Sequence, residues 1–315
     1  MHDLIRFLKD VVTRTPGADI AGCYVVREGS IYARNMTLMA GVAMESEIEF
    51  SVPAEELDLA LARMKEVQSL TVEENTVTIK AGRLKSTIKL NPDEPSSLPE
   101  MPEEWLKCPA ALIPSISAAR PFIGDRSWSL GIRLAQDRVT AFSNLAGIDI
   151  EVPGLLMGTP ALITETTAAF LVAQGAPSEY APEENAILFR WPDGRWACTQ
   201  LLTKRMPDIE PIFAKAGTET SIIITAAMRE AYADAAALSD GTVMITPNGF
   251  RALKGASTSD VEAPMALPEG HISYWSVKTL DAIMACATAW HPAAYPNASL
   301  FIGPGLRGVV AGVRR

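Results

Sequence analysis

The sequence predicts an α+β protein built from three tandem repeats, each a small domain of two helices on an antiparallel sheet. One mark is a short hairpin strand near the end of each repeat, at 75–79, 185–189 and 297–301. A turn glycine with a basic residue nearby follows each copy, at 82–83, 194–195 and 305–307. A second mark lies upstream, where an extended run ends in a polar step, at 52–55, 163–166 and 275–278. Both marks recur after roughly 110 residues, which indicates tandem domains because solenoid units run to only about 20–50 residues.

The first repeat reads as helix, hairpin, extended strand, helix and hairpin. Apolar residues recur at helical spacing from Leu4 to Val12, and Asp3 precedes them as a helix-capping residue. Residues 22–33 alternate around a turn at 27–30, which predicts a hairpin. The remaining elements expected are a helix at 53–65 and strands at 70–72, 77–80 and 84–90.

The second and third repeats follow the same plan. Helices are expected at 109–119 and 164–174 in the second repeat, with a hairpin turn at 136–138. In the third repeat, residues 225–238 form the strongest predicted helix because Ala, Met, Arg and Glu are good helix formers. A turn at 247–249 and a helix at 276–288 follow. A proline-rich acidic linker at 91–102 and a boundary closing near 217 divide the chain into domains 1–104, 105–215 and 216–315.

The composition is that of a soluble globular protein, with 48% hydrophobic and 21% charged residues in 315. No apolar run approaches the ~20 residues that span a bilayer, and the start of the chain has no signal-peptide pattern. Four widely spaced cysteines without a Cys-x-x-Cys pair are typical of a reducing compartment, although an extracellular disulfide stays open. We therefore expect a cytoplasmic protein without membrane contact.

The acidic balance limits the kinds of nucleic-acid binding that are possible. The net charge is −9, and residues 1–104 alone carry 11 basic against 18 acidic residues. Wrapping nucleic acid with the whole surface needs clustered cations, so this class is excluded. A protein with one basic face toward DNA and an acidic face toward solvent remains compatible with the composition.

Motifs of catalysis and metal binding are missing from the sequence. The three histidines have no metal-ligating neighbour at a useful spacing. There is no Gly-rich phosphate loop with a lysine and no Gly-x-Ser-x-Gly elbow, and Gly303-Pro304-Gly305 is interpreted as a turn. We expect no catalytic site, no metal and no cofactor, and a function that resides in the shape of the protein.

Four local sequences, in chain order, carry a resemblance to a known family. Residues 51–57 look like a strand-to-helix entry, and 82–86 are similar to a Gly-Arg-x-x-Phe strand, with Ser86 in place of a larger residue. Residues 206–209 resemble a Phe-Pro-Asp-Tyr element, and 309–315 resemble an apolar tail that ends in Arg-Leu. Together they resemble the bacterial DNA polymerase III β sliding clamp over the whole chain. The shortness and divergence suggest a phage-encoded or otherwise atypical member.

The resemblance implies a head-to-tail homodimeric ring that encircles double-stranded DNA without sequence preference. Such a ring holds DNA topologically, so a weakly basic lining suffices and the net charge of −9 is no obstacle. Arg14 and Arg126 match family positions that contact DNA. The residues expected to face DNA are Arg6, Lys9, Arg14, Arg63, Lys65, Arg120, Arg126, Arg229 and Lys278.

The resemblance also implies a hydrophobic cleft between the second and third domains, where a DNA polymerase and a clamp loader insert short peptides. The expected wall consists of Asn144, Leu145, Ile148, Val309, Ala311 and Val313. Ordinary core packing is the alternative for the valines. Residues 144–148 lack the family's Asp-Gly-His-Arg-Leu loop, which leaves the peptide preference open. Leu238, at the end of the strongest helix, is expected in the dimer interface.

Two other classes of function are compatible with the residues alone. One is a non-replicative structural or binding protein made of tandem α+β domains. The other is an enzyme whose site assembles between domains from dispersed residues. A stable ring-shaped dimer would favour the clamp, a monomer the enzyme and a large open assembly the structural protein.

Overall fold

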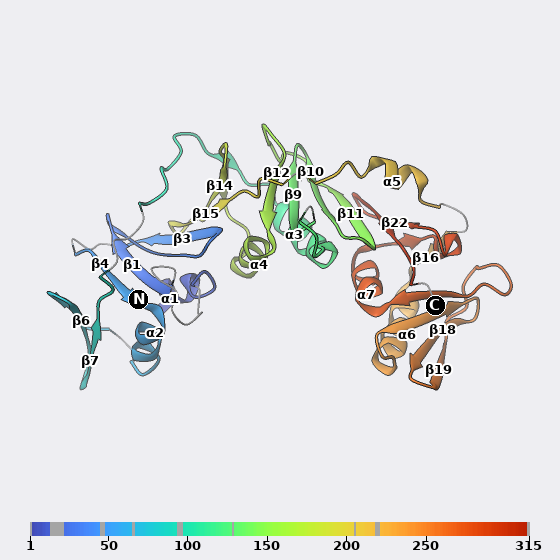
Figure 1. The fold of residues 1–315 in the computed structure, drawn as a ribbon, viewed down its shortest axis with the longest axis horizontal. Helices are drawn as coiled ribbons and strands as arrows, with labels where there is room; N and C mark the ends of the chain where they lie inside the picture. The colour runs from blue at the N-terminus through green and yellow to red at the C-terminus, as the bar shows by residue number, and fades with distance from the viewer. Residues whose placement is uncertain are drawn as a thin grey trace. The chain divides into compact units, whose positions relative to one another are not determined.

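A computed structural model describes residues 2–12, 22–44, 48–64, 67–92, 97–127, 129–204, 206–217 and 221–313 (Figure 1). Two residues expected to face DNA, Arg14 and Lys65, lie outside these ranges. The chain separates into two compact groups of elements, 1–108 with 169–201 (unit 1) and 109–168 with 202–315 (unit 2). None of the described helices is long and apolar enough to cross a membrane.

Unit 1 is built on an eight-stranded antiparallel sheet in the order β4-β1-β2-β3-β15-β14-β13-β8, beside a three-stranded sheet β5-β6-β7. Its helices are α1 (His2–Leu8), α2 (Ala54–Ala62) and the end of α4 (Glu165–Gln174). Its strands are β1 (Cys23–Arg27), β2 (Ser30–Arg34), β3 (Leu38–Ala43), β4 (Phe50–Pro53), β5 (Ser69–Glu73), β6 (Thr76–Ala81), β7 (Leu84–Lys89), β8 (Leu106–Lys107), β13 (Glu179–Pro182), β14 (Ala186–Arg190) and β15 (Arg195–Gln200).

Unit 2 repeats this plan, with an eight-stranded sheet β12-β9-β10-β11-β23-β22-β21-β16 and a four-stranded sheet β19-β18-β17-β20. Its helices are α3 (Leu112–Ala119), the 3-10 turn η2 (Arg120–Phe122), α5 (Glu210–Lys215), α6 (Ala226–Leu238), α7 (Val277–Cys286) and the 3-10 turn η3 (Pro292–Ala294). Its strands are β9 (Gly131–Ala135), β10 (Arg138–Phe142), β11 (Ala146–Glu151), β12 (Ala161–Thr164), β16 (Ile222–Ile223), β17 (Thr242–Thr246), β18 (Gly249–Lys254), β19 (Ser257–Glu262), β20 (Ser273–Ser276), β21 (Ala289–Trp290), β22 (Ser299–Gly303) and β23 (Leu306–Val310).

The predicted α+β class is confirmed, and the helix starts follow from local chemistry. The strongest predicted helix is α6, which begins after Thr225, whose side chain accepts a hydrogen bond from the Met228 backbone N–H at 3.2 Å. Thr164 caps α4 in the same way through the Thr167 N–H. The repeated turn glycines Gly82, Gly194 and Gly305 all have positive φ, a conformation that disfavours side chains and explains why glycine recurs there.

The large sheets run across the boundaries expected between repeats. Strand β3 of the first repeat pairs with β15 of the second, and β11 of the second pairs with β23 of the third. Each pairing satisfies the backbone groups of a strand that would otherwise be a free edge. The domain limits 1–104, 105–215 and 216–315 therefore stay predictions, since the two compact units do not follow the repeats.

Aromatic side chains fill both cores. In unit 1, Phe7 of α1 packs edge-on against Phe170 of α4 and Trp191, with ring centroids 5.3 and 5.5 Å apart. In unit 2, Trp275 and Trp290 lie 4.7 Å apart and are fully buried. Such pairs add about 0.5–1.5 kcal/mol beyond the burial of their area.

Three pairs of neighbouring strands place an aromatic ring over a glycine. A Cβ atom on these glycines would lie 2.3, 2.1 and 1.9 Å from ring atoms. The pairs are Gly41 with Trp196, Gly147 with Phe142 and Gly308 with Phe301. The first pair spans the seam between β3 and β15, and the glycines of the other two lie on β11 and β23, the two strands of the second seam. The close approach of ring and backbone therefore belongs to the joints between repeats.

Candidate functional site

A hollow of about 460 Å³ opens in unit 2 where three segments meet. Its walls are the end of η2 with the following loop (121–125), the turn between β10 and β11 (143–146), and the start of α7 (276–282). Two of the predicted cleft residues, Asn144 and Leu145, line it, and so does Lys278, which was expected to face DNA. The sequence did not indicate segment 121–125 as part of this site.

Hydrogen bonds within the β10–β11 turn present Leu145 to solvent. The Ser143 hydroxyl accepts from the backbone N–H groups of Leu145 and Ala146 at 3.4 and 3.1 Å. The Ser143 N–H in turn donates to the Ala146 carbonyl at 2.7 Å. This tight turn leaves the Leu145 side chain 53% exposed beside the hollow. An exposed leucine held by a rigid turn is suited to contact an apolar partner group.

The C-terminal residues are joined to the same turn and to β20. The Ala311 N–H donates to the Leu145 carbonyl at 2.7 Å, and the Val313 N–H donates to the Tyr274 carbonyl at 2.8 Å. The Tyr295 hydroxyl donates to the Val313 carbonyl at 2.8 Å. Ala311 and Val313 are half-buried, and neither is among the residues that line the hollow, so their place in the wall of a cleft stays a prediction.

Ile148 and Val309 are placed differently, within the core. Ile148 is fully buried and lies opposite Gly308 in the pairing of β11 with β23. One position along each strand, Gly147 lies opposite Val309. Because successive side chains of a strand point to opposite faces, Ile148 and Val309 lie on opposite faces of the sheet. Val309 packs under α5 in an apolar cluster with Phe142, Ile209 and Phe213.

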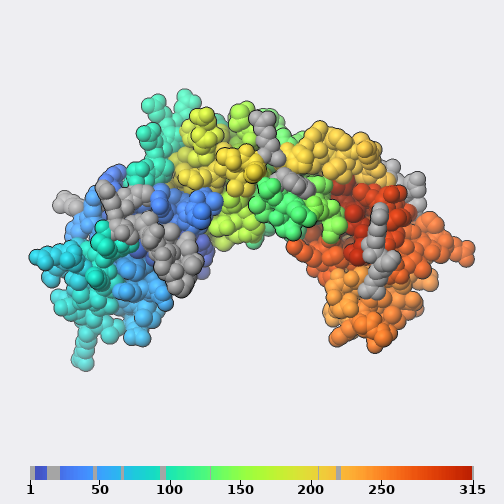
Figure 2. Space-filling model, in the orientation of Figure 1, coloured from blue at the N-terminus to red at the C-terminus, as the bar shows by residue number. Residues whose placement is uncertain are grey.

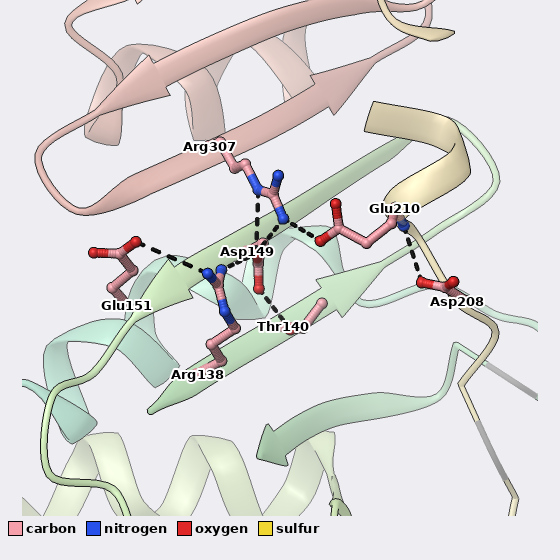
Figure 3. A network of polar contacts seen from close by, with 7 residues as sticks. All are labelled: Arg138, Thr140, Asp149, Glu151, Asp208, Glu210 and Arg307. Carbon is pink, nitrogen blue, oxygen red and sulfur yellow. Dashed lines mark hydrogen bonds and ion pairs between the residues drawn. The ribbon is translucent and has the colours of Figure 1, made fainter. Parts of the chain in front are cut away.

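The short helix α5 is fastened to this face of the sheet by a polar network (Figure 3). Asp149 of β11 is 3% exposed and accepts from Arg138, from the Thr140 hydroxyl at 3.0 Å, and from Arg307 at 3.1 Å. Arg307 also donates to Glu210 of α5. A buried carboxylate that is satisfied by two guanidinium groups and a hydroxyl avoids the large cost of an unpaired buried charge.

The Arg307 side chain combines this ion pairing with an aromatic contact. Its guanidinium carbon lies 4.4 Å from the centre of the Phe213 ring in α5. Burial alone would lower the pKa of Arg307, but the hydrogen bonds to Glu210 and Asp149 outweigh it and raise the pKa. The basic residue after the third repeated turn glycine is therefore structural, and it attaches the segment entering the third repeat to the sheet.

Several residues expected to face DNA take part in local structure. Arg120 is ion-paired with Glu165 at 2.7 Å. Arg229 donates to the carbonyls of Met284 and Ala287 at 2.7 Å each, where it satisfies free carbonyl groups at the end of α7. Their DNA contact stays a prediction.

The other described basic residues are more accessible. Arg126 lies 4.0 Å from Asp125, and its side chain is 65% exposed. Lys9, at the end of α1, and Arg63, which follows α2 as its C-cap, are exposed. Arg6 lines a second hollow of about 670 Å³ in unit 1, together with Arg195. No cluster of three metal-ligating side chains occurs in the described part of the chain.

The fold is that of a bacterial sliding clamp. Neither a scan against protein-family models nor a search of curated proteins finds a match. Among solved structures, the DNA polymerase III subunit β from Pseudomonas aeruginosa is 15% identical with a TM-score of 0.80, over 99% of this chain and 96% of that one. The C. crescentus β sliding clamp is 14% identical with a TM-score of 0.83, over 99% and 96%. The Helicobacter pylori β clamp is 12% identical with a TM-score of 0.77, over 99% and 97%.

Proposed function

We propose that this protein is a DNA sliding clamp that encircles duplex DNA as a homodimer and tethers DNA polymerase through short peptides. The observation that supports this function best is the match in fold to sliding clamps over 99% of the chain. A fold shared from end to end supports a shared way of working more strongly than a match over one domain would. In this proposal the protein acts as a processivity factor without a catalytic site of its own.

The partner site in this proposal is the hollow beside Leu145. One matching structure is a clamp bound to a DNA ligase peptide, and another has PEG bound to a putative β-motif tethering region. In this chain the exposed Leu145 and the apolar lining residues Ile123, Ala146 and Ala282 offer a place for an apolar anchor, and Ala311 is hydrogen-bonded to the Leu145 carbonyl. Burial of apolar surface contributes roughly 25 cal/mol per Å², less the cost of ordering the peptide, so micromolar affinity is expected.

The dimer interface in this proposal joins β7 of one chain to β19 of the other. Both are outer strands of their sheets in the described structure, so their backbone groups can accept a further strand. β7 exposes Lys85 and Lys89, whereas β19 exposes Asp260 and Glu262. Opposite charges on the two edges favour the head-to-tail pairing and disfavour pairing of like edges.

Apolar side chains flank both edges. Leu59 of α2 and Leu84 of β7 are 58% and 47% exposed and line a hollow of about 300 Å³. Leu238, at the end of α6 in the same unit as β19, is 49% exposed. Burial of these three leucines against one another would add a hydrophobic core to the edge pairing, which is how stable interfaces are built. Each chain would offer one kind of edge at each end. A head-to-tail contact between two such different surfaces gives a ring when the second chain closes back on the first.

Analytical ultracentrifugation of the wild type and of Leu238→Asp tests the ring. The wild type is expected to sediment as a dimer at low micromolar concentration, and the variant as a monomer because it places a charge in the apolar contact. Ile223→Asp is the matched control, since Ile223 is 73% exposed in the same unit but belongs to β16. An unchanged mass for Leu238→Asp would exclude this interface.

Retention on circular DNA tests encirclement. Linear DNA should bind weakly and be lost as salt rises, because only phosphate contacts hold it. A clamp loaded on a closed circle should stay bound at the same salt and be released when the circle is cut. Arg14→Glu combined with Arg126→Glu should slow loading while the fold stays intact. Equal loss from circular and linear DNA would contradict a ring.

A further inference from the structure

The two eight-stranded sheets end alike on the side of β8 and β16, which are the outermost strands and have two residues each. Three residues that lie opposite one another on the last three strands of each sheet form what we call the edge row. The edge row of unit 1 is Lys107, Glu179 and Arg190, and that of unit 2 is Ile223, Ala289 and Ile302. Residues opposite one another share a face of the sheet, so the two rows occupy equivalent surface positions, one charged and one apolar.

The edge row of unit 1 is suited to water and is covered by its own chain. Arg190 pairs with Glu179 at 2.6 Å, and Lys107 places a charge on the outermost strand, which is a common protection of a sheet edge. The ring of Trp105, two residues before Lys107, has its centre 4.4 Å from the Arg190 guanidinium carbon. The chain thus covers this part of the sheet with an aromatic ring of its own.

The edge row of unit 2 has neither the charge nor the ring. Ile223 and Ile302 are 73% and 40% exposed, and the small Ala289 between them is half-buried. Ser221 stands at the place equivalent to Trp105, two residues before Ile223, and its side chain is too short to cover the row. An apolar surface is therefore exposed at the position where unit 1 carries charges under an indole ring.

The backbone of Ile223 faces outward as well. The Ile224 N–H donates to the Thr288 carbonyl at 2.9 Å, so Ile224 directs its backbone groups toward β21. Neighbouring residues of a strand alternate in this respect, and Ile223 therefore directs its N–H and C=O away from β21. In the described structure β16 has a neighbouring strand on one side only. An outer strand of this kind, with an exposed apolar side chain, is suited to accept a further strand.

We infer that an extended segment of a partner protein adds to β16 as a further strand and packs an aromatic side chain on the edge row of unit 2. A residue opposite Ile223 on the added strand lies on the same face, and the small Ala289 beside it leaves room for a ring. Three side chains are too few for an interface between two folded surfaces, which buries roughly 1,200–2,000 Å² in total, so a single strand is the partner that fits. The inference is independent of the proposed clamp function, since no residue of this row lines the hollow beside Leu145.

NMR of the full-length protein with carbon-13-labelled isoleucine methyl groups tests the inference. The probe is the peptide Thr-Trp-Thr-Val-Thr with blocked ends, whose tryptophan and valine point to one face of a strand, and its twin has serine in place of tryptophan. The tryptophan peptide should shift the methyl signal of Ile223 most and that of Ile302 less, because an aromatic ring changes the magnetic field around it. The serine twin should shift neither. The signal of Ile272, which is 51% exposed in the loop before β20, is the internal control and should stay in place.

Two variants copy features of unit 1 into unit 2. Ala289→Glu introduces the carboxylate that unit 1 has at the same place of the row, and Ser221→Trp introduces the covering ring. Both should weaken the peptide affinity measured from the Ile223 methyl signal by roughly tenfold or more, because a charge or a ring then occupies the place of the peptide's tryptophan. Ile272→Glu is the matched control and should leave the affinity unchanged.

An unmoved Ile223 signal in the wild type, equal shifts with both peptides, or unchanged affinity in Ala289→Glu would overturn the inference and leave the clamp function standing. A second copy of this chain is the alternative occupant, and sedimentation decides about it. Wild type and Ala289→Glu should have the same mass, whereas a smaller mass for Ala289→Glu would show that the row joins two copies and would overturn the partner strand. Circular dichroism of each variant checks that the fold is retained.

Discussion

The two eight-stranded sheets share one topology but hold the segments that cover them by different means. The teal segment that leads to β8 and the gold segment that contains α5 are both visible at the surface of their own units in Figure 2. In unit 1, Leu98 is only half-buried against a cluster of Val25, Tyr32 and Trp196. In unit 2, Phe213 of α5 is 8% exposed within its apolar cluster. Leu98 thus anchors the segment entering the second repeat less deeply than Phe213 anchors the segment entering the third repeat.

The electrostatic attachments differ in the same direction. In unit 1, Arg190 lies 4.4 Å from the centre of the Trp105 ring and pairs with Glu179, whose side chain is 36% exposed. In unit 2, Arg307 makes a contact of the same kind with Phe213 but pairs with Asp149, which is buried. Water screens the first pair and not the second, so the same types of residue stabilise the two units to different extents.

The largest expected effect is the loss of the buried carboxylate. Asp149→Asn should lower the free energy of unfolding by about 3 kcal/mol, because the buried neutral amide weakens the hydrogen bonds from Thr140 and from two guanidinium groups. Glu179→Gln, which removes the carboxylate that pairs with Arg190 in unit 1, should cost less than about 1 kcal/mol. Denaturant unfolding of both variants measures the difference. Equal losses would mean that burial does not distinguish the two attachments.

The next effect concerns the apolar anchors. Phe213→Ala should destabilise unit 2 by about 2–4 kcal/mol through lost burial and a residual cavity. Leu98→Ala should cost about 1 kcal/mol, since Leu98 is half-buried and its neighbours can close over the gap. Thermal unfolding of the two variants checks the ranking. A larger loss for Leu98→Ala would reverse the comparison between the two segments.

A smaller effect is expected at the two corresponding turn tips. Leu145→Asp should weaken binding of an apolar peptide at least tenfold, about 1.4 kcal/mol, because it places a charge beside the hollow. Met36 is 90% exposed at the tip of the β2–β3 turn in unit 1, and Met36→Asp should leave peptide binding unchanged. Deletion of residues 313–315 should act like Leu145→Asp. The measurement is fluorescence anisotropy, and equal affinities for all variants would move the peptide site elsewhere.

The smallest effect is a pH dependence in unit 1. Burial alone would raise the pKa of the Asp193 carboxyl, but hydrogen bonds and the charge of Arg195 outweigh it and lower the pKa. A carboxyl with a lowered pKa stabilises the folded state above its unfolded pKa, and this contribution is lost as the pH falls through the folded pKa. Asp193→Asn should therefore reduce the loss of stability in acid slightly. An identical acid dependence in the two proteins would show that the pair contributes nothing.

Periodicity predicted most of the elements but not how they join. The predictions of helix α6 and of the hairpin of β1 and β2 were confirmed. A helix cap and a tight turn are specified by residues close together in the sequence, so both leave a local signal. The pairing of β11 with β23 joins residues about 160 positions apart, and a register of this kind leaves no local signal. Helix α5 was interpreted as a linker because six residues beside two prolines are too few to show a helical period.

The candidate site was predictable only in part, for the same reason. Asn144 and Leu145, which were expected in the wall of a cleft, line the hollow, and their role in binding a partner stays a prediction. Ile148 and Val309 are both buried in the core. They lie on opposite faces of the sheet, because neighbouring positions on a strand point to opposite sides, and a list of nearby residues does not reveal this. Segment 121–125 and Lys278 come to the hollow from distant parts of the chain, and the charge pattern could not separate Lys278 from lysines on open helix faces.

The aromatic rings that lie over glycines constrain how this chain can change over time. At Gly147 even a methyl group would overlap the ring of Phe142, so alanine is tolerated only if a smaller side chain replaces the phenylalanine first. The same order of substitutions applies to Gly41 and Trp196. Among diverged relatives, a side chain in place of either glycine should therefore occur together with a smaller residue in place of its aromatic partner.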